Sequence, residues 1–156
     1  MMMLTAKLDR KKLIIAALIV VAIVVSFLLP TGGSTTEIGK AETNDERIAF
    51  LASFGWDVVP EPVQSQEVLV PVESNEVFER YNELQKYQGY DLSRLSGKCV
   101  RRYVYEIKNY PNTDEPFYAT VLVYRDKIVG GDVASAAKGG LMHSFEMPKY
   151  QSGATT

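Results

Sequence analysis

A run of seventeen residues without a charge, Leu13 to Leu29, constrains this chain more than any other feature. Ser26 is its only polar residue, so a helix built from it would present apolar side chains on every face. Such a helix would be about 26 Å long at about 1.5 Å per residue, which is close to the thickness of the hydrocarbon core of a bilayer. Lipid favours a segment whose backbone satisfies its own hydrogen bonds. We therefore expect residues 13–29 to be a transmembrane helix that contacts membrane lipid.

The segment ahead of this run is basic, and it holds Lys7, Arg10, Lys11 and Lys12 against Asp9. A basic flank before an apolar span stays cytoplasmic. We therefore expect residues 1–12 to be a cytoplasmic tail and the part after the span to lie outside the cell. A cleaved signal peptide shares this charge pattern. The run is longer than the roughly 7–15 apolar residues of a signal peptide, and no clean small-x-small site follows it. The predicted localisation is the cell membrane, with a single uncleaved span.

The charge and cysteine content narrow the class of partner. Four of the seventeen basic residues and one of the nineteen acidic residues precede residue 30, so the remainder carries about −5. An acidic surface argues against nucleic acid and against an anionic membrane surface, because both favour basic patches. Cys99 is the only cysteine, which excludes an internal disulfide. An outward-facing domain without disulfides is more typical of a bacterial envelope than of an animal secretory pathway.

Composition divides the outer part into three segments. Residues 30–43 are rich in Gly, Ser and Thr and predict a flexible linker. Residues 44–147 are long enough for one extracytoplasmic domain. Residues 148–156 predict a disordered tail.

Two helices are predicted from apolar periodicity and capping residues. Thr43 and Glu46 have the spacing of a capping box at the start of a helix over residues 45–54, whose expected inner positions are Ile48, Leu51 and Ala52, flanked by Phe50 and Phe54. A second helix is expected over residues 75–88, with an inner stripe of Val77, Tyr81 and Leu84, and Phe78 beside it.

Strands are predicted at residues 64–70, 98–109, 117–124 and 127–133. The last three are separated by short connections and predict a three-stranded antiparallel meander, with both helices covering one face. Gly130 and Gly131 suggest a bulge or a close backbone approach in the last strand. The predicted fold class is α+β: a single N-terminal transmembrane helix, then helix–strand–helix, then the meander.

No cofactor, metal or catalytic residue is predicted. One histidine and one cysteine leave few ligands for a metal, and no glycine-rich segment has the spacing of a phosphate loop. Asp132, Ser135 and His143 are the residue types of a nucleophilic triad. Ser135 is flanked by alanines instead of the glycines of a nucleophile elbow. A small envelope hydrolase using these residues remains the alternative, and it requires the three side chains within about 3 Å of one another in a cleft.

A strand face that combines arginine and tyrosine offers a candidate binding surface. Arg101, Tyr103 and Tyr105 share one face by the two-residue period of a strand. Such side chains suit a peptide or glycan partner through stacking and planar hydrogen bonds. The other interpretation is that the tyrosines cover the sheet and serve only packing.

From about Asn44 to Phe145 the chain resembles the domain of unknown function 4830 family of small membrane-anchored proteins of Gram-positive anaerobes. The stretches that carry the resemblance are DERIAFLASFGW, LQKYQGYDLSRLSGK, YEIKNYP, YATVLVYRDKIVGGDV and GLMHSF. The resemblance implies one membrane anchor and one outer domain, and it implies no catalytic residue. The sequence therefore predicts a membrane-anchored extracytoplasmic binding domain of the bacterial cell envelope, with an envelope protein or glycan as partner, in preference to an enzyme.

Overall fold

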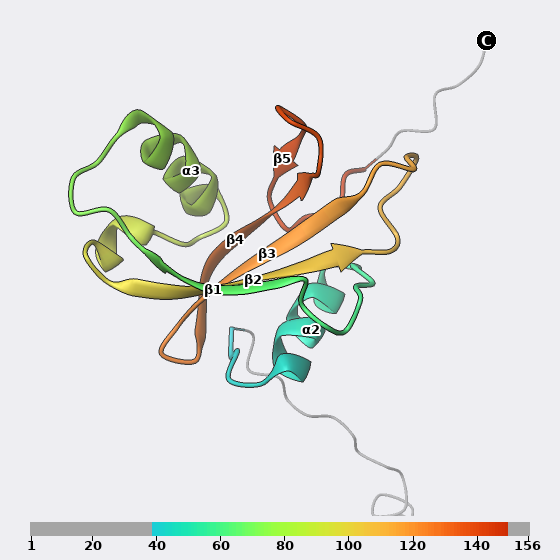
Figure 1. Cartoon of the computed structure of the whole chain (residues 1–156), viewed down its shortest axis with the longest axis horizontal. Helices are drawn as coiled ribbons and strands as arrows, with labels where there is room; N and C mark the ends of the chain where they lie inside the picture. The colour runs from blue at the N-terminus through green and yellow to red at the C-terminus, as the bar shows by residue number, and fades with distance from the viewer. Residues whose placement is uncertain (1–38, 150–156) are drawn as a thin grey trace, which may run out of the picture. The chain divides into compact units, whose positions relative to one another are not determined.

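The computed structural model describes residues 39–149, which form an antiparallel sheet with helices on both of its faces (Figure 1). Within these residues the sheet has five strands in the order β1-β2-β3-β4-β5, so each strand pairs with its neighbour in sequence. The connection from β1 to β2 contains the second helix and a short 3-10 helix. The elements are α2 (Asn44–Ser53), β1 (Gln64–Leu69), α3 (Glu76–Tyr87), η1 (Leu92–Leu95), β2 (Cys99–Ile107), β3 (Phe117–Tyr124), β4 (Lys127–Ser135) and β5 (Met142–His143).

The predicted three-stranded meander is wrong, because the sheet extends by one strand at each edge. β1 pairs along β2 from Gln64 opposite Val104 to Leu69 opposite Cys99. At the other edge β5 pairs with β4 through His143 opposite Val133. A two-residue strand has no period of its own, so the sequence pattern could not reveal β5.

The prediction that both helices cover one face is also wrong, since α2 and α3 lie on opposite faces (Figure 1). The strands bury apolar side chains on both sides. Phe50 and Leu51 of α2 pack with Tyr105 and Val121 in the larger cluster. Phe78 and Tyr81 of α3 pack against a second cluster formed by Val70, Leu92, Val100 and Leu122. Two apolar faces each need a cover, which one helical layer cannot provide.

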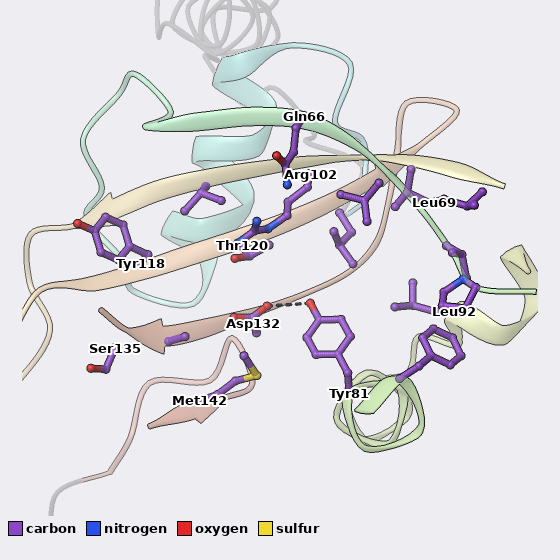
Figure 2. A pocket seen from close by; sticks show the side chains of 18 residues that line it. Gln66, Leu69, Tyr81, Leu92, Arg102, Tyr118, Thr120, Asp132, Ser135 and Met142 are labelled. Carbon is purple, nitrogen blue, oxygen red and sulfur yellow. Dashed lines mark hydrogen bonds between the residues drawn. The ribbon is translucent and has the colours of Figure 1, made fainter. Parts of the chain in front are cut away.

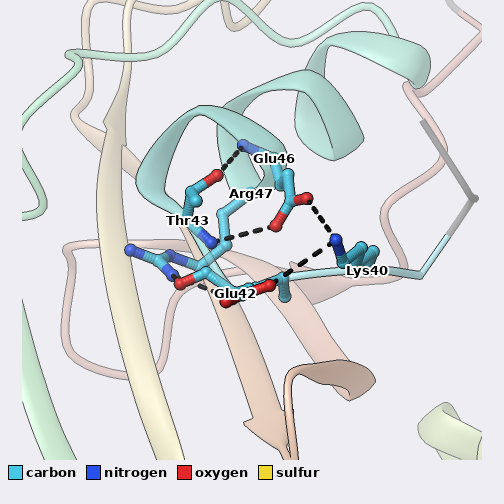
Figure 3. A network of polar contacts seen from close by, with 6 residues as sticks. Lys40, Glu42, Thr43, Glu46 and Arg47 are labelled. Atoms are coloured by element: carbon cyan, nitrogen blue, oxygen red, sulfur yellow. Dashed lines mark hydrogen bonds and ion pairs between the residues drawn. The ribbon is translucent and has the colours of Figure 1, made fainter. Parts of the chain in front are cut away.

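The N-terminus of α2 confirms the predicted capping box (Figure 3). The Thr43 hydroxyl accepts a hydrogen bond from the Glu46 backbone N–H, and the Glu46 carboxylate accepts one from the Thr43 N–H at 2.9 Å. The latter bond is the main cause that holds the pKa of Glu46 below its usual value. Lys40 pairs with the same carboxylate at 3.4 Å. Arg47, one turn into the helix, is buried and donates to the Ala41 carbonyl oxygen at 2.9 Å.

The predicted inner stripes are confirmed at Leu51 of α2 and at Tyr81 of α3, but they are wrong at Ala52 and Val77. In α2, Phe50 and Leu51 are buried as core residues while Ala52 is exposed. In α3, Val77 is 80% exposed. The buried positions of α3 are polar, Asn82 and Gln85.

These polar residues attach α3 to the rest of the domain through hydrogen bonds. The Asn82 side chain accepts from the Leu92 N–H at 2.8 Å, and the side-chain Oε1 of Gln85 accepts from the Gly131 N–H at 2.8 Å. Gln88 donates to the Gly131 carbonyl oxygen at 3.0 Å. Buried polar groups that form such hydrogen bonds hold α3 in one specific position on the sheet.

The close approach predicted at Gly130 and Gly131 is confirmed. A register shift in the pairing of β3 with β4 falls between Leu122 and Val123, as expected for a bulge. A Cβ atom on Gly131 would lie 2.1 Å from the Thr120 carbonyl oxygen. Only glycine fits at position 131, where the Thr120 backbone of β3 and the Phe145 ring approach β4 so closely.

The predicted cytoplasmic tail (1–12), the transmembrane helix (13–29) and most of the linker and tail lie outside the described residues. Among residues 39–149, no helix combines the length and the apolar character needed to cross a bilayer.

Candidate functional site

A groove of about 490 Å³ lies between α3 and the sheet, on the face opposite α2 (Figure 2). Its apolar lining comes from β1 to β5 together with α3 and η1, and comprises Val68, Leu69, Val70, Pro71, Phe78, Leu92, Val100, Val104, Tyr118, Leu122, Ala134 and Met142. Alternate residues of a strand point to one face, so Val100 and Val104 of β2 and Leu122 of β3 reach the same floor. Pockets of this size with a mainly apolar lining are typical sites for small ligands.

The groove contains one buried carboxyl group, Asp132 of β4, which is 4% exposed. Its Oδ1 accepts a hydrogen bond from the Tyr81 hydroxyl at 2.7 Å, drawn as the dashed line in Figure 2. Burial raises the pKa of Asp132 to about 6, against the opposing effects of the Tyr81 hydrogen bond and the charge of Arg102. Burial and the nearby carboxylate likewise raise the pKa of Tyr81. Asp132 thus titrates near pH 6, while Tyr81 remains a hydroxyl donor.

Arg102 of β2 supplies the groove with a positive charge. Within the described residues its guanidinium makes one hydrogen bond, a long one of 3.3 Å to the Gln64 side chain. It makes no ion pair with a carboxylate of residues 39–149 within 4.0 Å. Because guanidinium has five N–H donors, most of the Arg102 donors have no acceptor among residues 39–149.

The structure does not bring Asp132, Ser135 and His143 together as a triad. Asp132 bonds to Tyr81, whereas the Ser135 hydroxyl donates to the Glu115 carboxylate and accepts from the Ala137 N–H. Ser135 lies at the rim of the groove, where β4 ends.

His143 lies on the other side of the sheet from Asp132. It pairs with Val133, whose side chain belongs to the cluster under α2. Its Nε2 lies 3.1 Å from the Tyr110 hydroxyl oxygen, and its Nδ1 lies 2.7 Å from the Ser144 carbonyl oxygen. Burial lowers the pKa of His143. Both ring nitrogens therefore have partners other than Ser135.

The three predicted partner-binding residues lie on the α2 face and differ in exposure. Tyr105 is 0% exposed, and its hydroxyl accepts from Arg47 at 2.8 Å and donates to the Asn44 side chain at 2.9 Å. Tyr103 is half-buried, and the guanidinium carbon of Arg47 lies over its ring, 3.8 Å from the ring centroid. Arg101 is exposed and pairs with Glu67 at 3.1 Å. Tyr105 is therefore a core residue, whereas Arg101 and Tyr103 keep accessible surface and their role in partner binding stays a prediction.

Cys99 and metal ligands add no chemistry to the groove. Cys99 is exposed at the start of β2 and does not line the groove. Residues 39–149 contain no cluster of three His, Cys, Asp or Glu side chains placed to hold a metal ion.

The sequence pointed to Asp132 only as a member of the alternative triad, and it did not indicate Tyr81 and Arg102 as its neighbours. The three residues come from α3, β2 and β4, so no local spacing relates them. One signal was present, since Arg102 stands between Val100 and Val104 on an otherwise apolar strand face. A charge on such a face marks a position with special surroundings.

Comparisons with curated proteins and with solved structures found no match. The family model described as Domain of unknown function (DUF4830) matches residues 50–133, just over half of the chain and from within α2 to within β4. The chain therefore belongs to this family.

Proposed function

We propose that this protein is a membrane-anchored extracytoplasmic binding domain of the cell envelope, and that the groove between α3 and the sheet is its ligand site. The observation that supports this most is the groove itself, an apolar surface of β1 to β5 that also holds the Asp132 carboxyl group, the Arg102 guanidinium and the Tyr81 hydroxyl. A few polar groups set in an apolar pocket fix the orientation of a bound molecule.

A binding role fits the polar groups better than hydrolysis does. A nucleophilic mechanism needs a nucleophile within hydrogen-bond reach of a base. Ser135 bonds to Glu115, while His143 contacts Tyr110 and Ser144. In the groove, Tyr81 donates a hydrogen bond to Asp132, and both side chains are placed to contact a bound ligand.

The proposed location rests on the sequence outside the described residues. The basic flank of residues 1–12 and the charge-free run of residues 13–29 support an uncleaved anchor with the domain outside. The resemblance stated above extends this proposal to the envelope of a Gram-positive anaerobe. Mass spectrometry of the mature protein tests it, with residues 1–29 expected to be retained. A mature protein that begins near Ser34 or Glu42 would instead be secreted.

Methyl NMR of the full-length chain in lipid nanodiscs tests the groove. The Met142 side chain lines the groove, whereas Met147 packs in the cluster under α2 and serves as an internal control. We expect hexanol, a small neutral apolar probe, to shift the Met142 methyl signal and leave that of Met147 in place. Met142→Leu assigns the signal.

A pair of variants separates groove binding from general effects. Ala134 is a half-buried residue of the groove lining, so Ala134→Phe should fill part of the groove and reduce the Met142 response. Ala136→Phe adds the same ring at an exposed position outside the lining and should leave the response unchanged. An equal response in both variants, or none in the parent protein, would contradict the proposal.

A further inference from the structure

We propose that the ligand of the groove is an aliphatic carboxylate, with its carboxylate bound by Arg102 and its hydrocarbon chain lying on the apolar floor. This inference rests on the proposed function, since it names the ligand class of the same groove. It commits to a small amphiphilic acid in preference to a cation or a neutral molecule.

The head group is inferred from Arg102, whose charge has no ion-pair partner within 4.0 Å among residues 39–149. Arg102 is partly exposed at the groove and has one long hydrogen bond, to Gln64. A guanidinium presents paired N–H groups that match the two oxygens of a carboxylate. The neighbouring Arg101 provides a comparison on the same strand, because it already pairs with Glu67 at 3.1 Å on the other face. Arg102 is thus the arginine of β2 that is available to an anion.

A cationic ligand would fit the groove less well. Its counter-charge would have to be Asp132, which is 4% exposed and already accepts a hydrogen bond from Tyr81. The cation would also meet the like charge of Arg102. Burial raises the pKa of Asp132 to about 6, so the site disfavours the negative charge with which Asp132 would attract a cation.

The hydrocarbon chain has a continuous floor. The floor is formed by valines and a leucine of three neighbouring strands: Val68 of β1 with Val70 just after its end, Val100 and Val104 of β2, and Leu122 of β3. Each additional CH₂ group buried on this surface should increase the affinity by about fourfold, because the group is removed from water. A straight chain of six to eight carbons is therefore a suitable probe.

Binding of an anion near Asp132 should be coupled to a proton. The described charged or titratable groups that act on Asp132 are Tyr81 from α3 and Arg102 from β2. An anion on Arg102 offsets its favourable effect on the Asp132 carboxylate and adds repulsion, so it favours the protonated acid. By linkage, an anionic ligand must then bind more tightly when Asp132 is protonated, and affinity should fall as the pH rises through about 6.

The experiment compares octanoate with octanol, which has the same chain and no charge. Both are titrated into the full-length chain in lipid nanodiscs, with the Met142 methyl as the reporter and Met147 as its control. Affinities are expressed against the free aqueous concentration of each ligand, because octanol, octanoate and hexanoate partition into lipid to different extents. For a given ligand the partitioning is the same for parent and variants. We expect octanoate to bind at least about tenfold more tightly than octanol, and about 15-fold more tightly than hexanoate.

Two matched variants locate the carboxylate. Arg102→Gln should weaken octanoate binding at least about tenfold and leave octanol binding unchanged. Arg101→Gln removes the same charge on the opposite face and should change neither. Octanesulfonate, which stays ionised throughout, should bind at least about twofold less tightly at pH 8 than at pH 5.5, and Asp132→Asn should remove this dependence.

The outcomes separate this inference from the proposed function. Equal affinity for octanol and octanoate, or an Arg102→Gln variant that binds octanoate as the parent does, would overturn the carboxylate inference while groove binding stands. Failure of octanoate, octanol and hexanol alike to shift Met142 would overturn both. Tighter binding of octylamine than of octanoate would overturn the carboxylate inference and indicate a cationic ligand.

Discussion

Replacement of Asp132 by asparagine should remove a pH-dependent loss of stability from this domain. The carboxyl group is 4% exposed, and burial raises its pKa from 3.8 to about 6 in the folded state. Between these two values the folded protein binds more protons at Asp132 than the unfolded chain does. The free energy of unfolding therefore falls as the pH rises from about 4 through about 6, and it stays reduced above that range.

The size of the effect follows from the shift in pKa. A difference of about two units corresponds to about 3 kcal/mol, at about 1.4 kcal/mol per unit. Asparagine has nearly the same shape, can accept the hydrogen bond from Tyr81 and does not ionise. Relative to the parent, Asp132→Asn should thus gain up to about 3 kcal/mol of stability between pH 4 and pH 8.

Urea unfolding followed by circular dichroism at several pH values measures this difference. Comparing the two proteins at each pH cancels the contributions of other carboxyl groups, such as Asp91, whose pKa is lowered to about 2 chiefly by hydrogen bonds from Ser93 and Asn82. A stability difference that stays constant within about 0.5 kcal/mol from pH 4 to pH 8 would refute the reasoning. It would mean that Asp132 titrates in the folded state much as it does in the unfolded chain.

Three further substitutions test the packing and the polar contacts. Tyr81→Phe removes a 2.7 Å hydrogen bond to Asp132, so it should lower the free energy of unfolding by about 1.5–3 kcal/mol at pH 8 and by less at pH 4, as measured by urea unfolding. An equal loss at both pH values would contradict a hydrogen bond to the charged form of Asp132. Gly131→Ala places a Cβ 2.1 Å from the Thr120 backbone oxygen and should lower the free energy of unfolding by at least about 3 kcal/mol, more than Gly130→Ala, whose nearest contact is the flexible end of Gln85. Leu51→Ala in the core under α2 should cost about 2–5 kcal/mol by the same assay, and a cost below about 1 kcal/mol would show that the α2 core is wrongly assigned.

The elements of the fold could be predicted from the sequence because their signals are local. The helix expected over residues 45–54 is α2 (Asn44–Ser53), and the strand expected over residues 117–124 is β3 (Phe117–Tyr124). Capping residues and strand alternation act over a few positions, and one chain suffices to read them. The arrangement of these elements was harder to predict. Both faces of β2 and β3 carry apolar residues, which leaves open the side on which each helix packs.

The packing of α3 shows a second limit of sequence patterns. Apolar spacing favoured Val77 as an inner residue, yet the helix turns that side chain to solvent and buries Asn82 and Gln85. Their hydrogen bonds to Leu92 and Gly131 depend on partners 10 and 46 residues away in the chain. A pattern that scores only hydrophobicity assigns such residues to the surface.

The identity of residue 132 connects the stability of the domain to its proposed ligand. An ionised Asp132 removes about 3 kcal/mol from a protein of this size, a substantial part of the 5–15 kcal/mol by which folded proteins are usually stable. Asparagine would keep the bond to Tyr81 without that loss, so hydrogen bonding alone does not explain an acid at this position. A group that titrates near neutral pH beside Arg102 can instead adjust its charge to that of a bound anion. This account requires the same titration of Asp132 to govern both stability and ligand binding. Octanoate should therefore raise the pH at which the stability of the parent protein falls, and it should not change the pH dependence of stability in Asp132→Asn. If octanoate leaves that midpoint unchanged in the parent, the acid and the ligand are not coupled.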